Sequence, residues 1–492
     1  MTIELDKAFG LVGCEVIRGN KSAPFLLNTS AKILMINMDF LGPYIIAFSD
    51  WIWDLPLLIL LMGGGLFFML YSGFVPFRYL VHAVKVVGGK FDHESGPGQI
   101  TSYQALSAAI AATVGLGNIS GVAVAINMGG PGAIFWMWVS AFVGMATKFF
   151  TCTLAIMYRG KDSSGEIQGG PMYVIEEGLG KKWKPMAVVF SVAGVIGLLS
   201  IFQANQLTVL IRQVILIPNG WDYGEVTKWI IGLIMMSLVG MVIIGGIKRI
   251  AELASKLVPT MVAVYLLTVL YIVFSEIERV PEILAMIVED AFTGNAVMGG
   301  AVLAVMTIGA RRAAFSNEAG IGTAPMVHGA SKNNEPVREG MVAMLGPFID
   351  TIVVCTLTAL AILLTGVWET TEDDGVRLTV SAFEMAIPGV GRYLLMLSVF
   401  VFAFSTMFTY SYYGHKCSNY LFGARNANYY NYFYMITIVF GAVVSLKVVL
   451  SLVDGMYAIM AVPTMVSALL LAPKVRTATK DYVKRMKSKG TF

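Results

Sequence analysis

Charged residues are scarce in this chain of 492 residues. Asp, Glu, Lys and Arg together make up 13% of the sequence, whereas soluble globular domains carry about 25%. Hydrophobic residues make up 57%, and several apolar runs exceed the ~20 residues that a helix needs to cross a bilayer. A membrane barrel would need alternating segments of ~10 residues instead. The composition therefore excludes a soluble globular protein and predicts an all-α polytopic membrane protein.

Residues that bind metals or perform redox chemistry are also few. The four cysteines and four histidines have no metal-ligand spacing, and no disulfide framework is implied. The chain has neither a His-Glu-x-x-His pair nor a Gly-x-Ser-x-Gly elbow. The net charge of +4 comes from basic residues at the ends of apolar runs and does not indicate a nucleic-acid partner. We therefore expect no enzymatic activity and no cofactor.

The first 50 residues differ from the rest because they mix polar and apolar residues. They lack the basic start, apolar run and small-residue cleavage site of a signal peptide. Met38 offers an alternative start, so residues 1–37 are expected to be a dispensable extension or an over-extended start. We expect an extracellular extension at 1–50, one transmembrane domain at 51–473, and a basic cytoplasmic tail at 474–492.

The apolar runs predict eleven membrane-spanning helices. Lys and Arg concentrate in alternate connections and in the tail, which by the positive-inside rule face the cytoplasm. The N-terminus is then outside and the C-terminus inside, in the plasma (cell or inner) membrane. The helices are expected at about 55–74, 103–127, 133–157, 187–211, 228–246, 257–275, 299–322, 339–366, 390–413, 430–450 and 453–472.

Two of these runs contain residues that interrupt a helix at mid-depth. Gly115, Gly117 and Asn118 lie in the first, and the segment 308–322 holds several glycines and charges in the second. Glycine can simply allow close helix packing, but each free backbone group in hydrocarbon costs several kcal/mol. Apart from the first helix, the spans form sets of five, about 101–275 and 297–472. Because each set has an odd number of spans, the second set crosses the membrane in the opposite orientation to the first. Interrupted helices at matching positions of two such sets are typical of a transporter's midplane site.

An interrupted helix can bind a zwitterionic amino acid without using a fixed charge. Its N–H groups suit a carboxylate, and its carbonyl groups suit an ammonium. Glu318 is a contact of substrate or ion, or it pairs with an arginine and braces the interruption. Of the amides Gln203, Asn205 and Gln206, one of the first two is expected to face the cavity. The candidates for substrate binding from these patterns are Thr113, Gly115, Gly117, Asn118, Gln203, Asn205, Ser316, Asn317 and Glu318.

Further polar side chains in apolar runs have two interpretations. Ser405 and Thr406 either hydrogen-bond to carbonyls of the preceding turn or, with the Phe402 carbonyl, ligate a hard cation. Lys148 and Asp350 are expected to form ion pairs, either with each other or with another residue, and Asp350 is alternatively a proton relay.

Several long motifs resemble the alanine/glycine:cation symporter (AGCS) family, the sodium:alanine symporters. The resemblance covers about 51–473. It is carried by Thr113-Val-Gly-Leu-Gly-Asn-Ile-Ser-Gly-Val122, Gly129-Gly-Pro-Gly-Ala-Ile-Phe-Trp-Met-Trp138, Gly144-Met-Ala-Thr-Lys148, Gly169-Gly-Pro-Met-Tyr173, Phe315-Ser-Asn-Glu-Ala-Gly-Ile-Gly322 and Ser411-Tyr-Tyr-Gly414.

The resemblance implies a LeuT-type fold of the APC superfamily, with an inverted repeat of five plus five helices after one additional helix. It implies uptake of small neutral amino acids of the alanine/glycine class, driven by a sodium gradient or sometimes by protons, through alternating access. We expect a monomer in the lipid bilayer, with sodium as the coupling ion. The implied sodium ligands are Ala111, Val114, Phe402, Ser405 and Thr406.

The chain departs from the family pattern at three places. Leu116 stands where the family has Thr, Thr409-Tyr410 where it has Gly-Trp, and Thr151 where it has Glu. The first two departures are expected at the pocket, so Leu116 and Tyr410 join the substrate-binding candidates. Serine or glutamine therefore remains an alternative to alanine and glycine. A channel or a membrane sensor is the alternative of a different class, although no repeat resembles a selectivity filter.

Overall fold

The computed structural model describes residues 41–89, 96, 98–293 and 302–488. Residues 45–492 form one compact unit, and the few described residues before them belong to a separate N-terminal unit. The expectations for residues 1–37 lie outside the described part of the chain. The named elements in the described residues of this unit are helices, apart from a hairpin of β1 (Gly160–Lys161) and β2 (Ile167–Gln168), which pair antiparallel.

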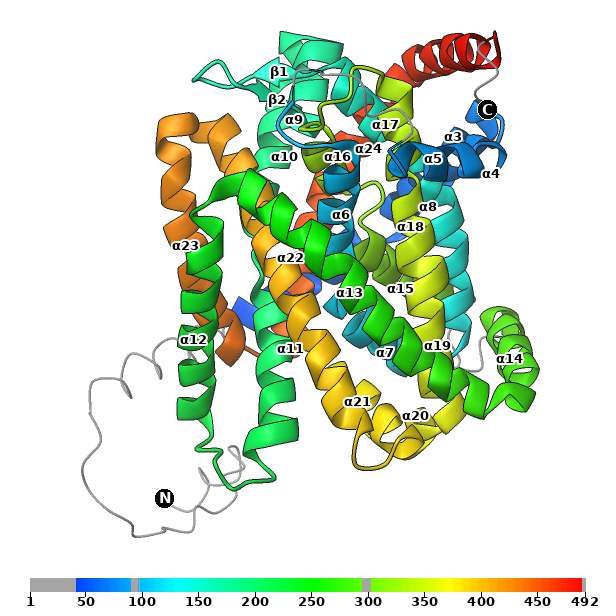
Figure 1. The fold of residues 1–492 in the computed structure, drawn as a ribbon, viewed down its shortest axis with the longest axis vertical. Helices are drawn as coiled ribbons and strands as arrows, with labels where there is room; N and C mark the ends of the chain where they lie inside the picture. The colour runs from blue at the N-terminus through cyan, green and yellow to red at the C-terminus, as the bar shows by residue number, and fades with distance from the viewer. Residues whose placement is uncertain (1–40, 90–95, 97, 294–301, 489–492) are drawn as a thin grey trace, which may run out of the picture. The chain divides into compact units, whose positions relative to one another are not determined.

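The elements before the second interrupted helix include all the spans of the first predicted set (Figure 1). In chain order they are α2 (Leu55–Leu58), η1 (Ile59–Gly63), α3 (Gly64–Ser72), α4 (Val75–Arg78), α5 (Leu80–Val87), α6 (Ser102–Thr113), α7 (Leu116–Gly129), α8 (Gly132–Met157), α9 (Pro171–Tyr173), η2 (Val174–Leu179), η3 (Lys181–Trp183), α10 (Lys184–Gly197), α11 (Ile201–Ile211), η4 (Arg212–Leu216), α12 (Glu225–Ile243) and α13 (Gly246–Ser275).

The remaining elements follow a short surface turn. They are η5 (Ile277–Arg279), α14 (Val280–Thr293), α15 (Val302–Asn317), α16 (Thr323–His328), α17 (Pro336–Ala343), α18 (Leu345–Pro347), η6 (Phe348–Cys355), α19 (Thr356–Thr365), α20 (Val367–Thr370), α21 (Val376–Ala386), α22 (Gly391–Phe422), α23 (Ala424–Val443) and α24 (Leu446–Ser488).

The described residues contain nine segments long and apolar enough to cross a membrane. The predicted count of eleven is therefore not confirmed. The difference lies in α15 and α23. α15 has 16 described residues and follows the undescribed segment 294–301, and α23 carries several Asn and Tyr residues among its 20.

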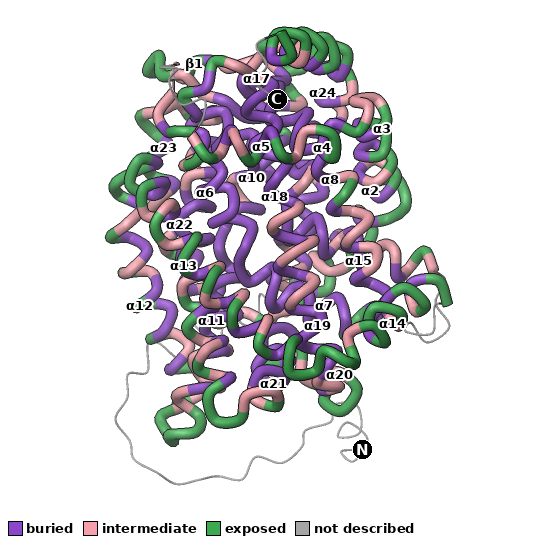
Figure 2. Tube along the Cα trace, turned by 45° about the vertical axis from the view of Figure 1, so that its right-hand side comes forward, coloured by how far each residue is buried: buried purple, intermediate pink, exposed green. Residues whose placement is uncertain are grey.

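The first interrupted helix lies in the interior. Of the most apolar window of Ser102–Gly129, 94% is buried, against 33% for α13 (Figure 2). α15 packs against α7 and α8, and both α13 and α22 pack against α6. The core of the unit is therefore built around the segment that the sequence predicts to be interrupted. Most of the apolar window of α13, in contrast, is not buried by the protein.

The interruption of the first helix occurs at Val114 and Gly115. α6 begins with a capping box, in which Thr101 Oγ1 accepts a bond from Gln104 N and Gln104 Oε1 accepts one from Thr101 N. The helix ends at Thr113, both following residues are extended, and α7 restarts at Leu116. The interruption predicted from the two glycines is therefore present.

The second interruption spans residues 318–322, between α15 and α16. Glu318 has φ +56°, and Gly320 and Gly322 have φ +87° and +106°. Within the described part of the chain, Glu318 and Phe74 are the two non-glycine residues with positive φ. A residue with a Cβ pays about 1–2 kcal/mol for this conformation, so the bonds around Glu318 must hold it.

The structure also contains features that the helix predictions lacked. The expected helix 187–211 is two helices, α10 and α11, separated by residues 198–200. The region before the expected helix 390–413 contains α21, and α24 continues through Pro463 and Pro473 well beyond residue 472.

Candidate functional site

A cluster of neutral oxygen atoms joins the first interruption to α22. Thr406 Oγ1 lies 3.0 Å from Ala111 O and 3.0 Å from Phe402 O. Ser405 Oγ lies 2.9 Å from Phe402 O and 3.4 Å from Ala111 O. The bonds to Phe402 are the expected bonds within the helix, but those to Ala111 cross to α6. Four of the five predicted sodium ligands therefore meet through oxygen atoms, the ligand type that hard cations prefer.

Gly115 allows this close approach. A Cβ at this position would lie 2.7 Å from Thr406 Oγ1 and 3.7 Å from Phe402 O. Val114, the fifth predicted ligand, is extended immediately before it and is fully buried. The interruption thus brings the backbone of α6 against the hydroxyl-bearing face of α22.

Asn118 ties the start of α7 to η6. Its Oδ1 accepts a bond of 2.7 Å from Gly115 N, and its Nδ2 donates to Asp350 O and Asp350 Oδ1 at 2.9 and 2.7 Å. Because its amide oxygen and nitrogen are both engaged and the residue is fully buried, Asn118 acts here as a cap and a bridge.

Asp350 is the acceptor at the centre of this polar network. Besides Asn118, Ser316 Oγ donates to Asp350 Oδ2 at 2.9 Å and Thr351 Oγ1 donates to the same oxygen at 2.7 Å. Asn317 Nδ2 in turn donates to Thr351 Oγ1 at 3.0 Å. The expectation that Asp350 pairs with Lys148 is wrong in the described residues, where neutral donors surround this carboxylate.

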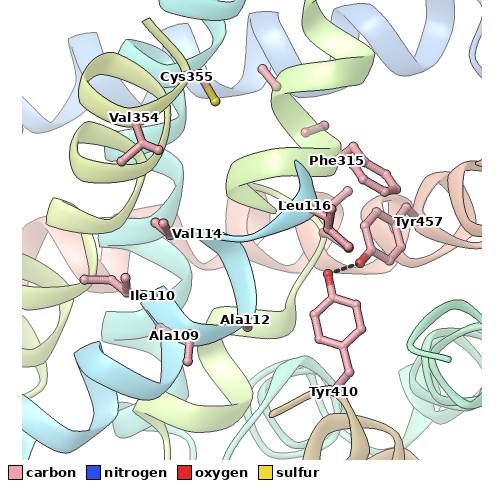
Figure 3. Packing of buried hydrophobic residues seen from close by; sticks show 14 of the residues in the cluster. Ala109, Ile110, Ala112, Val114, Leu116, Phe315, Val354, Cys355, Tyr410 and Tyr457 are labelled. Carbon is pink, nitrogen blue, oxygen red and sulfur yellow. Dashed lines mark hydrogen bonds between the residues drawn. The ribbon is translucent and has the colours of Figure 1, made fainter. Parts of the chain in front are cut away.

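Glu318 and Tyr410 form a second network on the other side of the interruptions. Tyr410 OH lies 2.7 Å from Tyr457 OH (Figure 3). Tyr410 OH also donates to Glu318 Oε1, and Tyr457 OH lies 3.3 Å from the same oxygen. Thr323 Oγ1 donates to Glu318 Oε2. Glu318 therefore braces its own unusual backbone through hydroxyl groups from α16, α22 and α24.

Leu116 and Phe315 are buried beside this network. Figure 3 shows both side chains next to Tyr457, and the ring centres of Phe315 and Tyr457 lie 6.1 Å apart. Phe315 makes an edge contact with Phe202, with ring centres 4.9 Å apart. Leu116, where the family resemblance expects Thr, thus adds an apolar surface to the junction of the two interrupted helices.

The three side-chain amides of α11 differ in their hydrogen bonding. Asn205 Nδ2 donates to Val444 O at 2.5 Å and to Gly441 O at 3.3 Å. Gln206 Oε1 accepts bonds from Ser120 Oγ and from the backbone at 376. Gln203 Oε1 is buried without a hydrogen-bond partner among the described residues. Of the two candidates for a cavity-facing amide, Gln203 has the oxygen available for a ligand.

An ion-pair cluster lies on α15 at Arg311 and Arg312, one to two turns before the second interruption. Asp454 Oδ2 accepts bonds from Arg311 Nε at 2.8 Å and from Arg312 Nη2. Arg311 also reaches Asp50 at 3.0 Å, and Trp53 Nε1 donates to Asp454 O at 2.9 Å. Both arginines therefore pair with Asp454. The alternative in which one pairs with Glu318 is wrong.

A cavity of about 670 Å³ lies directly outside this cluster. Arg311, Arg312 and Asp454 form part of its wall. The Arg312 guanidinium lies 5.3 Å from the centre of the Phe315 ring. Phe315 in turn contacts Tyr457, so Asp454, Arg312 and Phe315 form a series of contacts from the cavity wall to the network of Glu318.

The structure brings together the predicted candidates in three groups. All are buried, and none of the non-glycine residues is more than 5% exposed. The ion-ligand candidates gather at α6 and α22, and Asn118, Ser316 and Asn317 gather around Asp350. Glu318 and Tyr410 gather with Leu116. Thr113 lies apart, because its hydroxyl donates to Ala109 O in its own helix.

Sequence reasoning missed several participants. Tyr457 carried no signal, since a tyrosine in an apolar helix is ordinary. Asp454 is an acid within an apolar run, the same signal that singled out Lys148 and Asp350, and it could have been found in this way.

Comparisons with known proteins identify relatives of this chain. A model of the sodium:alanine symporter family matches residues 38–491. The chain is 40% identical to an uncharacterized transporter of Haemophilus influenzae, over 90% of this chain and 96% of that protein. It is 36% identical to the sodium/alanine symporter AgcS of Methanococcus maripaludis, over 90% and 98% respectively. The crystal structure of MhsT in complex with L-phenylalanine superposes with a TM-score of 0.54 at 12% identity, over 77% of this chain and 98% of that one.

The likeness to MhsT shows a LeuT-type fold. The family match, together with the apolar helices of the described residues, supports a multi-pass membrane protein of the transporter class. The chain belongs to the sodium:alanine symporter family. That family consists of transporters, so the prediction that the protein is not an enzyme is confirmed.

Proposed function

We propose that the protein is a secondary active symporter that takes up small neutral amino acids of the alanine/glycine class, driven by a sodium gradient. The observation that carries this proposal is the oxygen cluster at the first interruption, where Thr406 Oγ1 contacts Ala111 O across two helices. A cation held there would link α6 to α22, and its binding would be coupled to the conformation of the interrupted helix.

In this proposal the substrate binds where the two interruptions meet. Backbone groups at the start of α7 would receive its carboxylate, and freed carbonyls and the buried Gln203 Oε1 would receive its ammonium. Leu116 and Tyr410 would contact its side chain. The substrate-binding roles of Thr113, Gly115, Gly117, Asn118, Asn205, Ser316, Asn317 and Glu318 are part of this proposal, although Asn118 and Asn205 would act mainly by fixing the helices.

The architecture in this proposal is the inverted repeat. The first set runs from α6 to α13 and the second from α15 to α24, with α2–α3 as the additional helix and eleven spans in all. The N-terminus would be outside, the C-terminus in the cytoplasm, and the carrier a monomer in the cell membrane.

Uptake into proteoliposomes tests the proposal. Purified protein is expected to accumulate labelled alanine or glycine only under an inward sodium gradient, with saturation kinetics. Serine and glutamine are assayed alongside, and a proton gradient replaces the sodium gradient in a parallel series. Flux that does not saturate would identify a channel, and accumulation under a proton gradient alone would replace sodium as the coupling ion.

A further inference from the structure

A basic cavity of about 480 Å³ lies away from the interrupted helices, where α3 and α4 meet the C-terminal part of α24. Five exposed cationic residues line it, Arg78 on α4 and Arg476, Lys480, Lys484 and Lys487 on α24. No acidic residue is among the described residues of its wall. The cavity thus concentrates positive charge without a counter-charge in its lining.

The cations of α24 form one stripe on the helix. Arg476, Lys480, Lys484 and Lys487 follow each other at intervals of four, four and three residues, which places them on one face. Like charges one turn apart repel each other and destabilise a helix. An anion in the cavity would relieve this repulsion.

Contacts on the other side of α24 hold the stripe toward the cavity. Tyr482 OH lies 2.7 Å from His82 Nε2 of α5. Arg485 Nη2 lies 2.5 Å from Glu335 Oε2, just before α17. Because the opposite face of the helix is docked in this way, the cationic face cannot simply turn away (Figure 1 shows the end of α24 beside α3, α4 and α5).

The other wall of the cavity continues into an apolar surface. Leu66, Phe67 and Leu70 on α3 are exposed, and Leu70 also lines the cavity. The Arg476 guanidinium lies 4.5 Å from the centre of the Tyr71 ring, and that ring stacks on Phe67 at 5.1 Å. The aromatic rings therefore connect a membrane-facing surface directly to the cationic stripe.

A sharp turn after α3 brings the fifth cation into position. Gly73 and Phe74 both have left-handed backbone conformations, with φ of +71° and +61°. The turn redirects the chain into α4, so that Arg78 lines the same cavity as Gly73. A bulky residue such as Phe seldom adopts this conformation without compensating contacts.

We propose that this cavity binds the phosphate headgroup of an anionic phospholipid whose acyl chains lie along the exposed surface of α3. Charge complementarity calls for an anion, and the apolar continuation of the wall calls for a lipid rather than free phosphate. The site is separate from the proposed transport pathway and does not depend on it.

Lipid binding to the purified full chain tests the proposal. The variant K480Q/K484Q/K487Q removes three cations of the stripe and keeps most of each side chain. The matched variant K181Q/K182Q/K474Q removes three exposed lysines that do not line the cavity. Thermal unfolding in detergent is measured with cardiolipin, phosphatidylglycerol, phosphatidylethanolamine or inorganic phosphate.

The two anionic lipids are expected to stabilise the wild type and the matched variant, and to bind the stripe variant at least about ten-fold more weakly. Phosphatidylethanolamine and inorganic phosphate should have little effect. Equal stabilisation by inorganic phosphate would overturn the lipid assignment. Equally weakened binding of the anionic lipids by both variants would overturn the specific site, because general charge attraction would then explain the binding.

A second measurement needs only the wild-type protein. A photoactivatable phosphatidylglycerol, cross-linked in vesicles and mapped by peptide mass spectrometry, is expected to label segments 66–79 and 476–487. Labelling confined to other segments would overturn the proposal, whatever the variants do.

Discussion

The hydroxyl of Thr406 shows how a single residue can satisfy two interpretations of one pattern. Its bond to Phe402 O is the back-bond that any helix interior allows a threonine. Its bond to Ala111 O has no such local explanation, because it joins residues 295 positions apart. The sequence alone could not separate these two bonds, since only the fold brings α6 against α22.

Thr406→Val is expected to raise the sodium concentration for half-maximal uptake by about ten-fold or more, because valine keeps the shape and removes one ligand oxygen. The measurement is initial uptake in proteoliposomes against external sodium. Thr268→Val on α13, whose hydroxyl bonds only within its own helix, serves as the control. An unchanged sodium response in the Thr406 variant would contradict the proposed ion site.

Glu318→Gln is expected to lower uptake by about ten-fold and to destabilise the protein by about 1–3 kcal/mol. The amide nitrogen cannot accept the bonds that Thr323 and Tyr410 donate to the carboxylate, so a buried hydroxyl loses its acceptor. Uptake kinetics and thermal unfolding measure the two effects. Glu252→Gln, an exposed change on α13, is the control, and wild-type behaviour of both proteins would show that the network is dispensable.

At the scale of elements, the two interruptions are held by side chains that the sequence could only partly reveal. Glycines, an asparagine and charges in apolar runs predicted interruptions around Gly115 and within 308–322. The first is present, but the second is confined to 318–322, because α15 stays helical to Asn317. The partners could not be predicted, because they are far apart in the sequence. Asn118 and Asp350 are separated by 232 residues, and Glu318 and Tyr457 by 139. Periodicity likewise could not predict the division between α10 and α11, because apolar residues continue through it.

Asn118→Ala is expected to lower the free energy of unfolding by about 1–3 kcal/mol, since it removes a cap from Gly115 N and a donor from buried Asp350. The measurement is unfolding in detergent, with and without substrate. Asn127→Ala, a change of the same residue type near the exposed end of α7, should have little effect. Full stability with reduced substrate affinity would instead make Asn118 a direct ligand.

The topology of the whole molecule predicts that the two ends of α24 lie on opposite sides of the membrane. In a Cys14→Ser background, Lys447→Cys should react with a membrane-impermeant maleimide on intact cells, and Lys480→Cys should react only after permeabilisation. Both lysines are exposed, and the three cysteines in the described residues are buried. The reverse labelling pattern would invert the topology proposed from the positive-inside rule.

The additional helix also takes part in the organisation of the whole molecule. Trp53 and Asp50, just before α2, contact the cluster of Asp454 and Arg311. Asp454→Asn is expected to destabilise the protein by about 3–5 kcal/mol, because it leaves buried Arg312 without its carboxylate. Thermal unfolding measures the loss, and Asp481→Asn on the exposed part of α24 is the control. An unchanged unfolding temperature would show that the cluster does not join these helices.

The ligand cluster of Ala111, Phe402, Ser405 and Thr406 contains no formal charge. A zwitterion travelling with a sodium ion bound there would carry one net positive charge inward, so each cycle would generate an electrical current. A potential of 100 mV is worth about 2.3 kcal/mol per charge, or roughly a fifty-fold change in the accumulation ratio at equilibrium. The voltage across the bilayer would then drive accumulation alongside the salt gradient.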